Sequence, residues 1–112
     1  MVKKRVKNLK KVLDQYRKAL EKKIKVQQMI LFGSYARGNP RDYSDIDLAV
    51  ISPDFKGMSI MDELFLDRAA CEITSLIEAF PYTPSDLKKR KKGSFLDEIL
   101  RTGKVVYRCG EI

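Results

Sequence analysis

The chain has 112 residues, of which 44% are hydrophobic and 34% are charged, and this size and composition predict one globular domain spanning residues 1–112. It contains no apolar run near twenty residues, and its first residues are basic rather than apolar, which argues against membrane insertion or a secretory signal and makes the cytoplasm the expected location. The net charge of +8 favours nucleotides, nucleic acid or acidic proteins as partners without choosing among them.

The first third of the chain predicts a helix, a strand and a turn. Between Val2 and Leu20, apolar residues recur every three or four positions with Lys and Arg between them, which is the pattern of an amphipathic helix. Residues 24–32 predict the first strand, and Gly33 follows where the backbone must turn sharply. Residues 34–37 predict a short helix after that turn.

The rest of the chain predicts strands that alternate with helices. Residues 47–52 are almost continuously apolar, as expected for a second strand covered on both faces. Helical spacing from Ile60 to Ile73 predicts a long helix, and residues 76–80 predict a strand that ends before Pro81. The later elements are a helix capped by Thr83, a helix from Ser94 to Gly103, and a short strand at 104–107. This order predicts an α/β fold, a small mixed β-sheet flanked by helices.

The cysteines do not indicate a metal site. Cys71 and Cys109 lie far apart, and the chain has neither a CxxC pair nor a histidine. We therefore expect two free thiols rather than zinc ligands.

Two carboxylates lie two residues apart at the start of the second strand. Side chains alternate along a strand, so Asp45 and Asp47 project from one face while Ile46 and Leu48 point to the other. Two carboxylates this close repel each other, and the pair persists most easily when a divalent cation bridges it. Mg²⁺ commonly binds one or two carboxylates together with phosphate oxygens. The spacing therefore predicts a magnesium site.

A phosphate-binding turn is predicted just before these acids. Gly33 allows a ligand to approach the backbone closely, and amide groups at the start of a helix attract anions. The hydroxyl of Ser34 can add a hydrogen bond to a phosphate oxygen. Arg37 is a further candidate phosphate contact, with a surface salt bridge to Asp42 or Asp45 as the equally supported alternative.

These residues together resemble a known family. Gly33 and Ser34, ten intervening residues, then Asp45-x-Asp47 resemble the signature of the DNA polymerase β-like nucleotidyltransferase superfamily. The strings GSYARG and SDIDLAV are similar to its smallest members, the minimal nucleotidyltransferases, over residues 24–107. The resemblance implies a polymerase β-like palm. It also implies a third acid on a neighbouring strand, and Glu78 fits that position although the family usually carries Asp there.

The resemblance implies nucleotidyl transfer from ATP with Mg²⁺ as the cofactor. Asp45, Asp47 and Glu78 would be the catalytic, metal-binding acids, and Gly33, Ser34 and Arg37 would bind the phosphates. Minimal nucleotidyltransferases commonly pair with a small helical HEPN-domain toxin, an RNase, and act as its antitoxin by adding AMP to one of its tyrosines. The resemblance therefore implies such a protein partner.

Several alternatives stay open at this stage. Glu78 could simply point to solvent from an edge strand. The chain could be a module that binds nucleotide or a partner without catalysis, although its complete set of motif residues favours an enzyme. Basic residues within 3–25 and 88–92 suggest nucleotidyl transfer to RNA, but a solvated basic surface explains them as well. The residues alone do not identify the acceptor or the preferred base.

Overall fold

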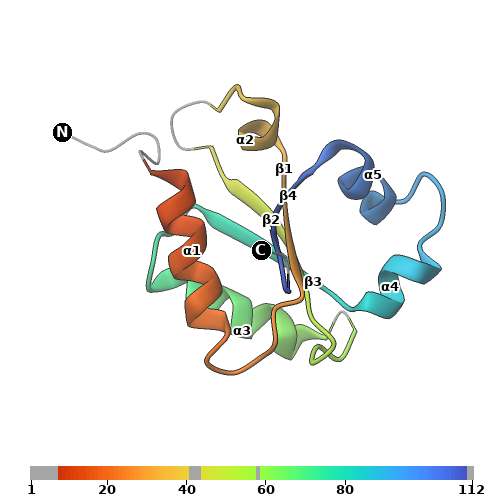
Figure 1. The fold of residues 1–112 in the computed structure, drawn as a ribbon, viewed down its shortest axis with the longest axis horizontal. Coiled ribbons are helices and arrows are strands. Elements are labelled where there is room, and N and C mark those ends of the chain that lie inside the picture. The colour runs from red at the N-terminus through yellow and green to blue at the C-terminus, as the bar shows by residue number, and fades with distance from the viewer. Residues whose placement is uncertain (1–7, 41–43, 58, 111–112) are drawn as a thin grey trace.

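The computed structural model describes residues 8–40, 44–57 and 59–110. Their elements form a four-stranded mixed sheet with helices on both faces (Figure 1), which confirms the predicted α/β fold. In chain order the elements are α1 (Leu9–Leu20), β1 (Gln28–Phe32), α2 (Ser34–Arg37), β2 (Ile46–Ile51), α3 (Ile60–Cys71), β3 (Ile77–Tyr82), α4 (Pro84–Lys89), α5 (Phe95–Thr102) and β4 (Lys104–Arg108). The predicted helical positions before residue 8 lie outside the described residues.

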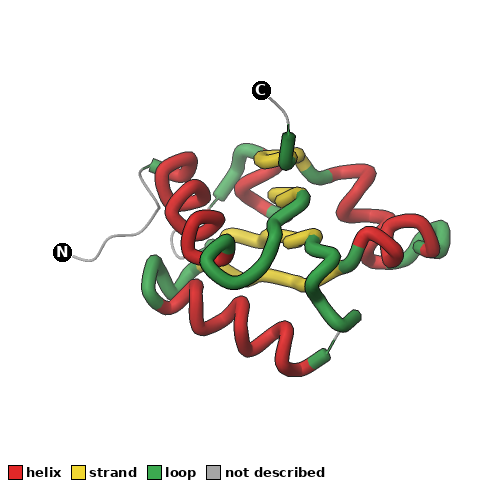
Figure 2. Tube along the Cα trace, turned by 60° about the horizontal axis from the view of Figure 1, so that its bottom comes forward, coloured by secondary structure: helices red, strands yellow, loops and turns green. Residues whose placement is uncertain are grey.

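The sheet separates two helical layers, as Figure 1 and Figure 2 show from two sides. α1 and α3 cover one face, and α4 and α5 lie beyond the other. β2 supplies side chains to both layers: Leu48 and Val50 belong to the core cluster under α1 and α3, while Ala49 and Ile51 belong to the cluster under α5. All four are fully buried, so the continuous apolar run of β2 is explained by burial on both faces.

The strand order is β3-β2-β1-β4. β1 runs antiparallel to β2 and to β4, and β2 runs parallel to β3. One cross-strand row at the end of the sheet is formed by Phe32 of β1, Asp47 of β2 and Glu78 of β3, since Phe32 pairs with Asp47 and Asp47 pairs with Glu78. Residues paired across strands share a face, so these side chains lie on the face covered by α5.

The first strand is shorter than predicted, because it begins at Gln28 rather than at residue 24. The amide of Ile24 still bonds the carbonyl of Leu20 at 3.0 Å, in the turn that closes α1. The next amide, that of Lys25, donates to the carboxylate of Asp54 at 2.8 Å instead of to a neighbouring strand. These two contacts at the start of the segment keep its first residues out of the sheet, and the backbone reaches the sheet at Gln27, whose amide donates to the carbonyl of Ile51 at 2.8 Å.

The third strand is longer than predicted, because it continues through Pro81 to Tyr82. Proline has no amide proton for a sheet ladder, but β3 lies at the edge of the sheet, where one side of the strand needs no hydrogen-bonding partner. Pro81 is buried and pairs with Val50 of β2. The helix predicted to reach Ile73 ends at Cys71, and Ile73 closes a turn onto Ala70.

Two expectations from composition can be compared with the structure. Among the described residues no helix could cross a membrane, since α1 and α3 have only 12 residues each and none of the helices carries a long apolar stretch. Cys71 and Cys109 are both free and exposed, as predicted.

A buried hydrogen bond joins α1 to α3 and gives a testable contribution to stability. The hydroxyl of Tyr16, which is fully buried, donates to the carbonyl of Leu66 at 3.0 Å. We expect Tyr16→Phe to lower the free energy of unfolding by about 1 kcal/mol in a urea titration, since one buried hydrogen bond is lost. The control is Tyr107→Phe, whose hydroxyl makes a 3.4 Å contact with the exposed Glu21 and should contribute less than about 0.5 kcal/mol. Equal losses in the two variants would contradict this account.

Candidate active site

The structure brings the three predicted acids together. Asp47 and Glu78 are register partners on the parallel strands β2 and β3, and Asp45 lies two residues before Asp47. Each offers a carboxylate oxygen, and these oxygens all lie within 4.8 Å of one another. Asp45 and Glu78 are exposed while Asp47 is half-buried. Glu78 therefore does stand on an edge strand, but its carboxylate faces the other two acids.

The carboxylates of this cluster repel one another. The pKa of Asp47 is raised from 3.8 to about 6, first by burial and then by the neighbouring charges of Glu78 and Asp45. The charge of Arg37 acts in the opposite direction and lowers this pKa. Among the residues that the structure describes, the three carboxylates thus carry more negative charge than the guanidinium of Arg37 offsets, which is the condition in which a divalent ion is bound most favourably.

The carboxylate set fits Mg²⁺. Mg²⁺ holds oxygen ligands at about 2.1 Å, so two ligands of one ion are at most about 4.2 Å apart. The three carboxylate oxygens lie within 4.8 Å of one another, and exposed Asp and Glu side chains can close such a difference by small rotations. All of the donors are hard oxygen atoms, and no histidine is present in the sequence. This donor set favours Mg²⁺ over zinc.

Gly33 places a backbone turn directly against the acids. It adopts φ 77° and ψ −155° between β1 and α2, a region of backbone conformation that is essentially restricted to glycine. A Cβ atom at this position would overlap Oδ2 of Asp47 and lie 3.2 Å from its Cγ. Ser34 begins α2 on the other side of the turn. The predicted phosphate-binding turn and the predicted metal-binding acids therefore adjoin.

Arg37 ends the short helix α2 and is exposed. Its guanidinium is close enough to Asp47 to lower the pKa of that carboxyl. Of the two salt bridges considered from sequence, Asp42 lies outside the described residues, and the ion pairs among the described residues do not include one between Arg37 and Asp45. Its position beside the acids keeps it as a candidate phosphate contact.

Three phenylalanines lie beside the acids, and the sequence predicted no functional role for them. Phe32, Phe80 and Phe95 form a triangle of rings with centroids 5.6, 5.6 and 5.7 Å apart. Alternation along the strands could have placed Phe32 and Phe80 on the face of the acids, since Phe32 precedes Gly33 and Phe80 lies two residues after Glu78. Nothing in the sequence pattern places Phe95, which comes from α5.

A separate hollow of about 350 Å³ lies between α1 and α3 and is lined in part by Lys22, Met61 and Arg68. Met61 is 68% exposed, and its neighbour Ile60 is 72% exposed. This groove lies on the opposite face of the sheet from the three carboxylates. It therefore has no part in the chemistry of the acids.

A glycine turn against clustered carboxylates on a mixed sheet is the arrangement expected of an enzyme that transfers phosphate-linked groups. The family profile described as "Nucleotidyltransferase domain" matches residues 13–105. The chain belongs to this nucleotidyltransferase family, and the resemblance seen in its sequence is confirmed.

Individual relatives agree with this assignment. A predicted protein adenylyltransferase of Methanocaldococcus jannaschii is 48% identical over 42 residues, which are 38% of this chain and 42% of that protein. Another from the same organism is 29% identical over 103 residues, covering 89% of this chain and 99% of the relative. The chain therefore spans less than half the length of the first relative but nearly all of the second.

Solved structures share the fold. The structure of a toxin–antitoxin complex with AMP-PNP contains a chain that superimposes with a TM-score of 0.62 at 22% sequence identity, covering 94% of this chain and 76% of that one. This likeness supports the same arrangement of sheet and helices. At this level of identity it carries no information about substrates.

The close approach of Gly33 to Asp47 gives a prediction. Gly33→Ala should lower the free energy of unfolding by about 2–4 kcal/mol, because it combines backbone strain with displacement of the Asp47 carboxylate. The matched control is Gly57→Ala, at φ +84° with open space around it, where only the backbone cost of about 1–2 kcal/mol is expected. Urea unfolding of both variants measures the difference. Indistinguishable losses would mean that the turn does not press on the acid.

The raised pKa of Asp47 predicts a pH-dependent stability. The folded state holds this proton more tightly than the unfolded chain, whose carboxyl titrates near 3.8. Stability therefore falls as pH rises from 3.8 to about 6, and the penalty is complete above that window. In metal-free buffer near neutral pH, Asp47→Asn should raise the free energy of unfolding by roughly 1 kcal/mol, a value reduced for solvent screening at a half-exposed site.

The measurement for Asp47→Asn is a set of urea titrations across this pH range. The gain should disappear below the window, where the carboxyl is protonated in both states. Glu63→Gln, an exposed acid on α3 and away from the cluster, serves as the control and should show no such gain. A variant that is destabilised at every pH would contradict the repulsion inferred for the cluster.

Proposed function

We propose that this chain is a Mg²⁺-dependent nucleotidyltransferase that moves AMP from ATP to a tyrosine hydroxyl of a partner protein, a small helical HEPN-domain toxin, and so acts as its antitoxin. The observation that carries the proposal is the convergence of the carboxylates of Asp45, Asp47 and Glu78 within 4.8 Å, against the turn at Gly33. Membership of the nucleotidyltransferase family supports the reaction class.

Each site residue has a proposed role. Asp45, Asp47 and Glu78 would hold Mg²⁺, which when bound would neutralise the triphosphate charge and lower the pKa of the attacking hydroxyl. Gly33 lets the triphosphate approach the backbone without a clash, and Ser34 donates its hydroxyl to a phosphate oxygen. Arg37, at the end of α2, balances the charge of the phosphates.

The transfer step balances as a displacement at phosphorus. The acceptor hydroxyl oxygen forms a bond to the α-phosphorus of ATP while the bond from that phosphorus to the pyrophosphate oxygen breaks. Pyrophosphate leaves with the bonding electron pair, and the hydroxyl proton passes to the carboxylate of Glu78. Glu78 suits this role because it is exposed on the edge strand β3, where an acceptor from another molecule can reach it.

The protein acceptor is supported by the relatives and by the openness of the site. Two similar proteins are named as predicted protein adenylyltransferases, and a chain of the same fold occurs in a toxin–antitoxin complex with AMP-PNP. Both Asp45 and Glu78 are exposed, so a side chain carried on a second protein has access to the acids. The exposed acids admit an acceptor from another molecule, and the names of the relatives favour a protein hydroxyl over RNA.

The test is transfer of α-³²P label from ATP to a helical protein encoded beside this one. Labelled tyrosine is expected only with Mg²⁺, and Asp45→Asn or Asp47→Asn should lower the rate by about 100-fold or more, because the metal-binding acids are lost. Asp67→Asn is the matched control: it removes an exposed carboxylate from α3, on the other face of the sheet, and should leave the rate unchanged.

Other outcomes would overturn this assignment in distinct ways. ATP binding without label on any partner would make the chain a binding module. Label on RNA in place of protein, with affinity that falls steeply with salt, would make it an RNA-modifying enzyme. Loss of label in the Asp67→Asn control would mean that the effect of the aspartate changes is not specific to the cluster.

A further inference from the structure

The aromatic triangle lies one step from the acids on the same face of the sheet. Phe32 is the register partner of Asp47, and Phe80 lies two residues beyond Glu78 on β3. Neighbouring strands are about 5 Å apart, and two residues along a strand span about 7 Å. The rings are therefore within one nucleotide's reach of the carboxylates.

Ala49 makes room for the triangle. In the row behind the acids, Ala49 of β2 is paired with Ile30 on one side and Phe80 on the other. Its side chain is small and fully buried, and the rings of Phe32 and Phe80, from the strands on either side of β2, contact each other with centroids 5.6 Å apart. Phe95 of α5 covers both rings in edge-on contacts.

Phe95 is the exposed member of the triangle. Phe32 is 9% exposed, whereas Phe95 is 52% exposed although it sits over an apolar cluster. A large aromatic ring that is anchored on one side and open on the other offers a face or edge to a planar ligand. It also lines a shallow hollow in which three basic residues, Lys89, Arg90 and Lys91, outnumber one acid, Asp86. The surroundings of Phe95 are therefore polar and net basic, which suits a nucleotide better than an apolar protein surface.

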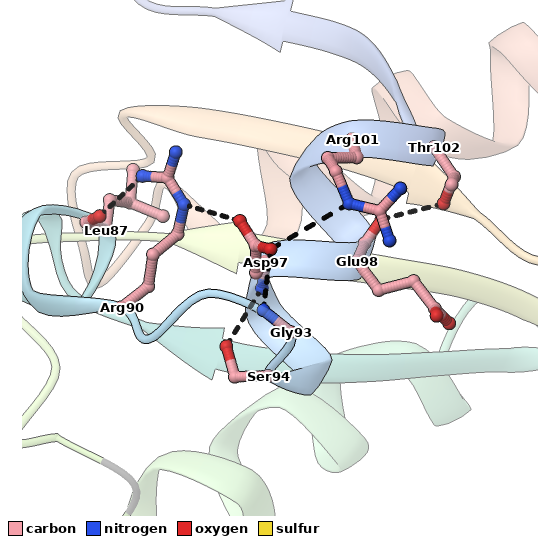
Figure 3. A network of polar contacts seen from close by, with 8 residues as sticks. All are labelled: Leu87, Arg90, Gly93, Ser94, Asp97, Glu98, Arg101 and Thr102. Atoms are coloured by element: carbon pink, nitrogen blue, oxygen red, sulfur yellow. Dashed lines mark hydrogen bonds and ion pairs between the residues drawn. The ribbon is translucent and has the colours of Figure 1, made fainter.

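The position of Phe95 is fixed by polar contacts around the start of α5, shown in Figure 3. Ser94 caps the helix by accepting from the amide of Asp97 at 3.2 Å. The Asp97 carboxylate in turn accepts from the amide of Gly93 at 2.9 Å and pairs with Arg90 and Arg101. These contacts, with the Gly93 amide first, hold the pKa of Asp97 below its usual value. The loop before Phe95 is thereby tied to the helix.

We propose that Phe95 is the stacking platform for the base of the nucleoside triphosphate whose phosphates the Gly33 turn binds beside the three acids. This inference rests on the proposed nucleotidyl transfer and adds the residue that holds the donor's base. Stacking uses the face of the base rather than its hydrogen-bonding edge, so it favours the larger purines without distinguishing adenine from guanine.

The first test compares two ligands on one variant. Phe95→Leu keeps an apolar side chain but removes the aromatic ring, so its affinity for AMP-PNP with Mg²⁺ should fall about tenfold or more. Its affinity for inorganic tripolyphosphate, which has no base, should change less than about twofold. Titration calorimetry measures both. Phe65→Leu, the same change on α3 across the sheet, is the control and should alter neither affinity.

A second variant reports on the contact directly. The chain has no tryptophan, so Phe95→Trp introduces a single indole whose fluorescence responds to a stacked base. Its emission should be quenched by AMP-PNP and not by tripolyphosphate. The platform is ruled out if Phe95→Leu leaves the affinity for AMP-PNP unchanged, or lowers the affinities for AMP-PNP and tripolyphosphate equally. It is also ruled out if the two ligands change the fluorescence of the indole in Phe95→Trp equally.

These outcomes are separable from failure of the proposed function. If AMP-PNP binding depends on Phe95 but the chain labels no acceptor, the proposed transfer is refuted and the stacking role of Phe95 stands. Transfer of label that proceeds with unchanged KM for ATP in Phe95→Leu would keep the transfer and refute the platform.

Discussion

The constraint on which the rest of this structure depends is the register that sets Asp47 beside Glu78. The core beneath β2 fixes it: Ile46 and Leu48 are fully buried on the opposite face from Asp47. A slip of one residue would turn Asp47 into that core and expose two large aliphatic side chains, at several kcal/mol. Hydrophobic burial on one face thus holds mutually repelling carboxylates together on the other. The raised pKa of Asp47 is the electrostatic consequence.

Gly33 is the steric counterpart of this arrangement. The same pairing that sets Phe32 opposite Asp47 brings the next residue of the chain against the carboxylate. Only a residue without a Cβ can stand there. The glycine of the motif is therefore required by its contact with the acid as well as by the backbone conformation of the turn.

The sequence predicted those features of the site that depend on residues close together in the chain. Alternation placed Asp45 and Asp47 on one face, and the end of an apolar run placed the turn at Gly33. Glu78 needed the family resemblance, because the parallel pairing of β3 with β2 joins segments about thirty residues apart. β1 begins at Gln28 rather than at residue 24. The amide of Lys25 bonds Asp54 instead of a neighbouring strand, and no local pattern reveals this long-range contact. Phe95 was missed for the same reason, since only the packing of α5 brings its ring against Phe32 and Phe80.

The two faces of the sheet differ in how completely helices and apolar side chains cover them, and the less covered face is the one that bears the candidate active site. Of the residues that the structure describes, 14 are buried in the cluster under α1 and α3 and 7 in the cluster under α5. The face that bears the acids is therefore the less completely covered one, with short helices and an aromatic ring left half open. A ligand that covers Phe95 would extend this smaller core. If the same ligand also neutralises the acids, it removes the repulsion among their carboxylates. Because such a ligand binds only the folded chain, its binding free energy would add to the stability of the face that needs it most.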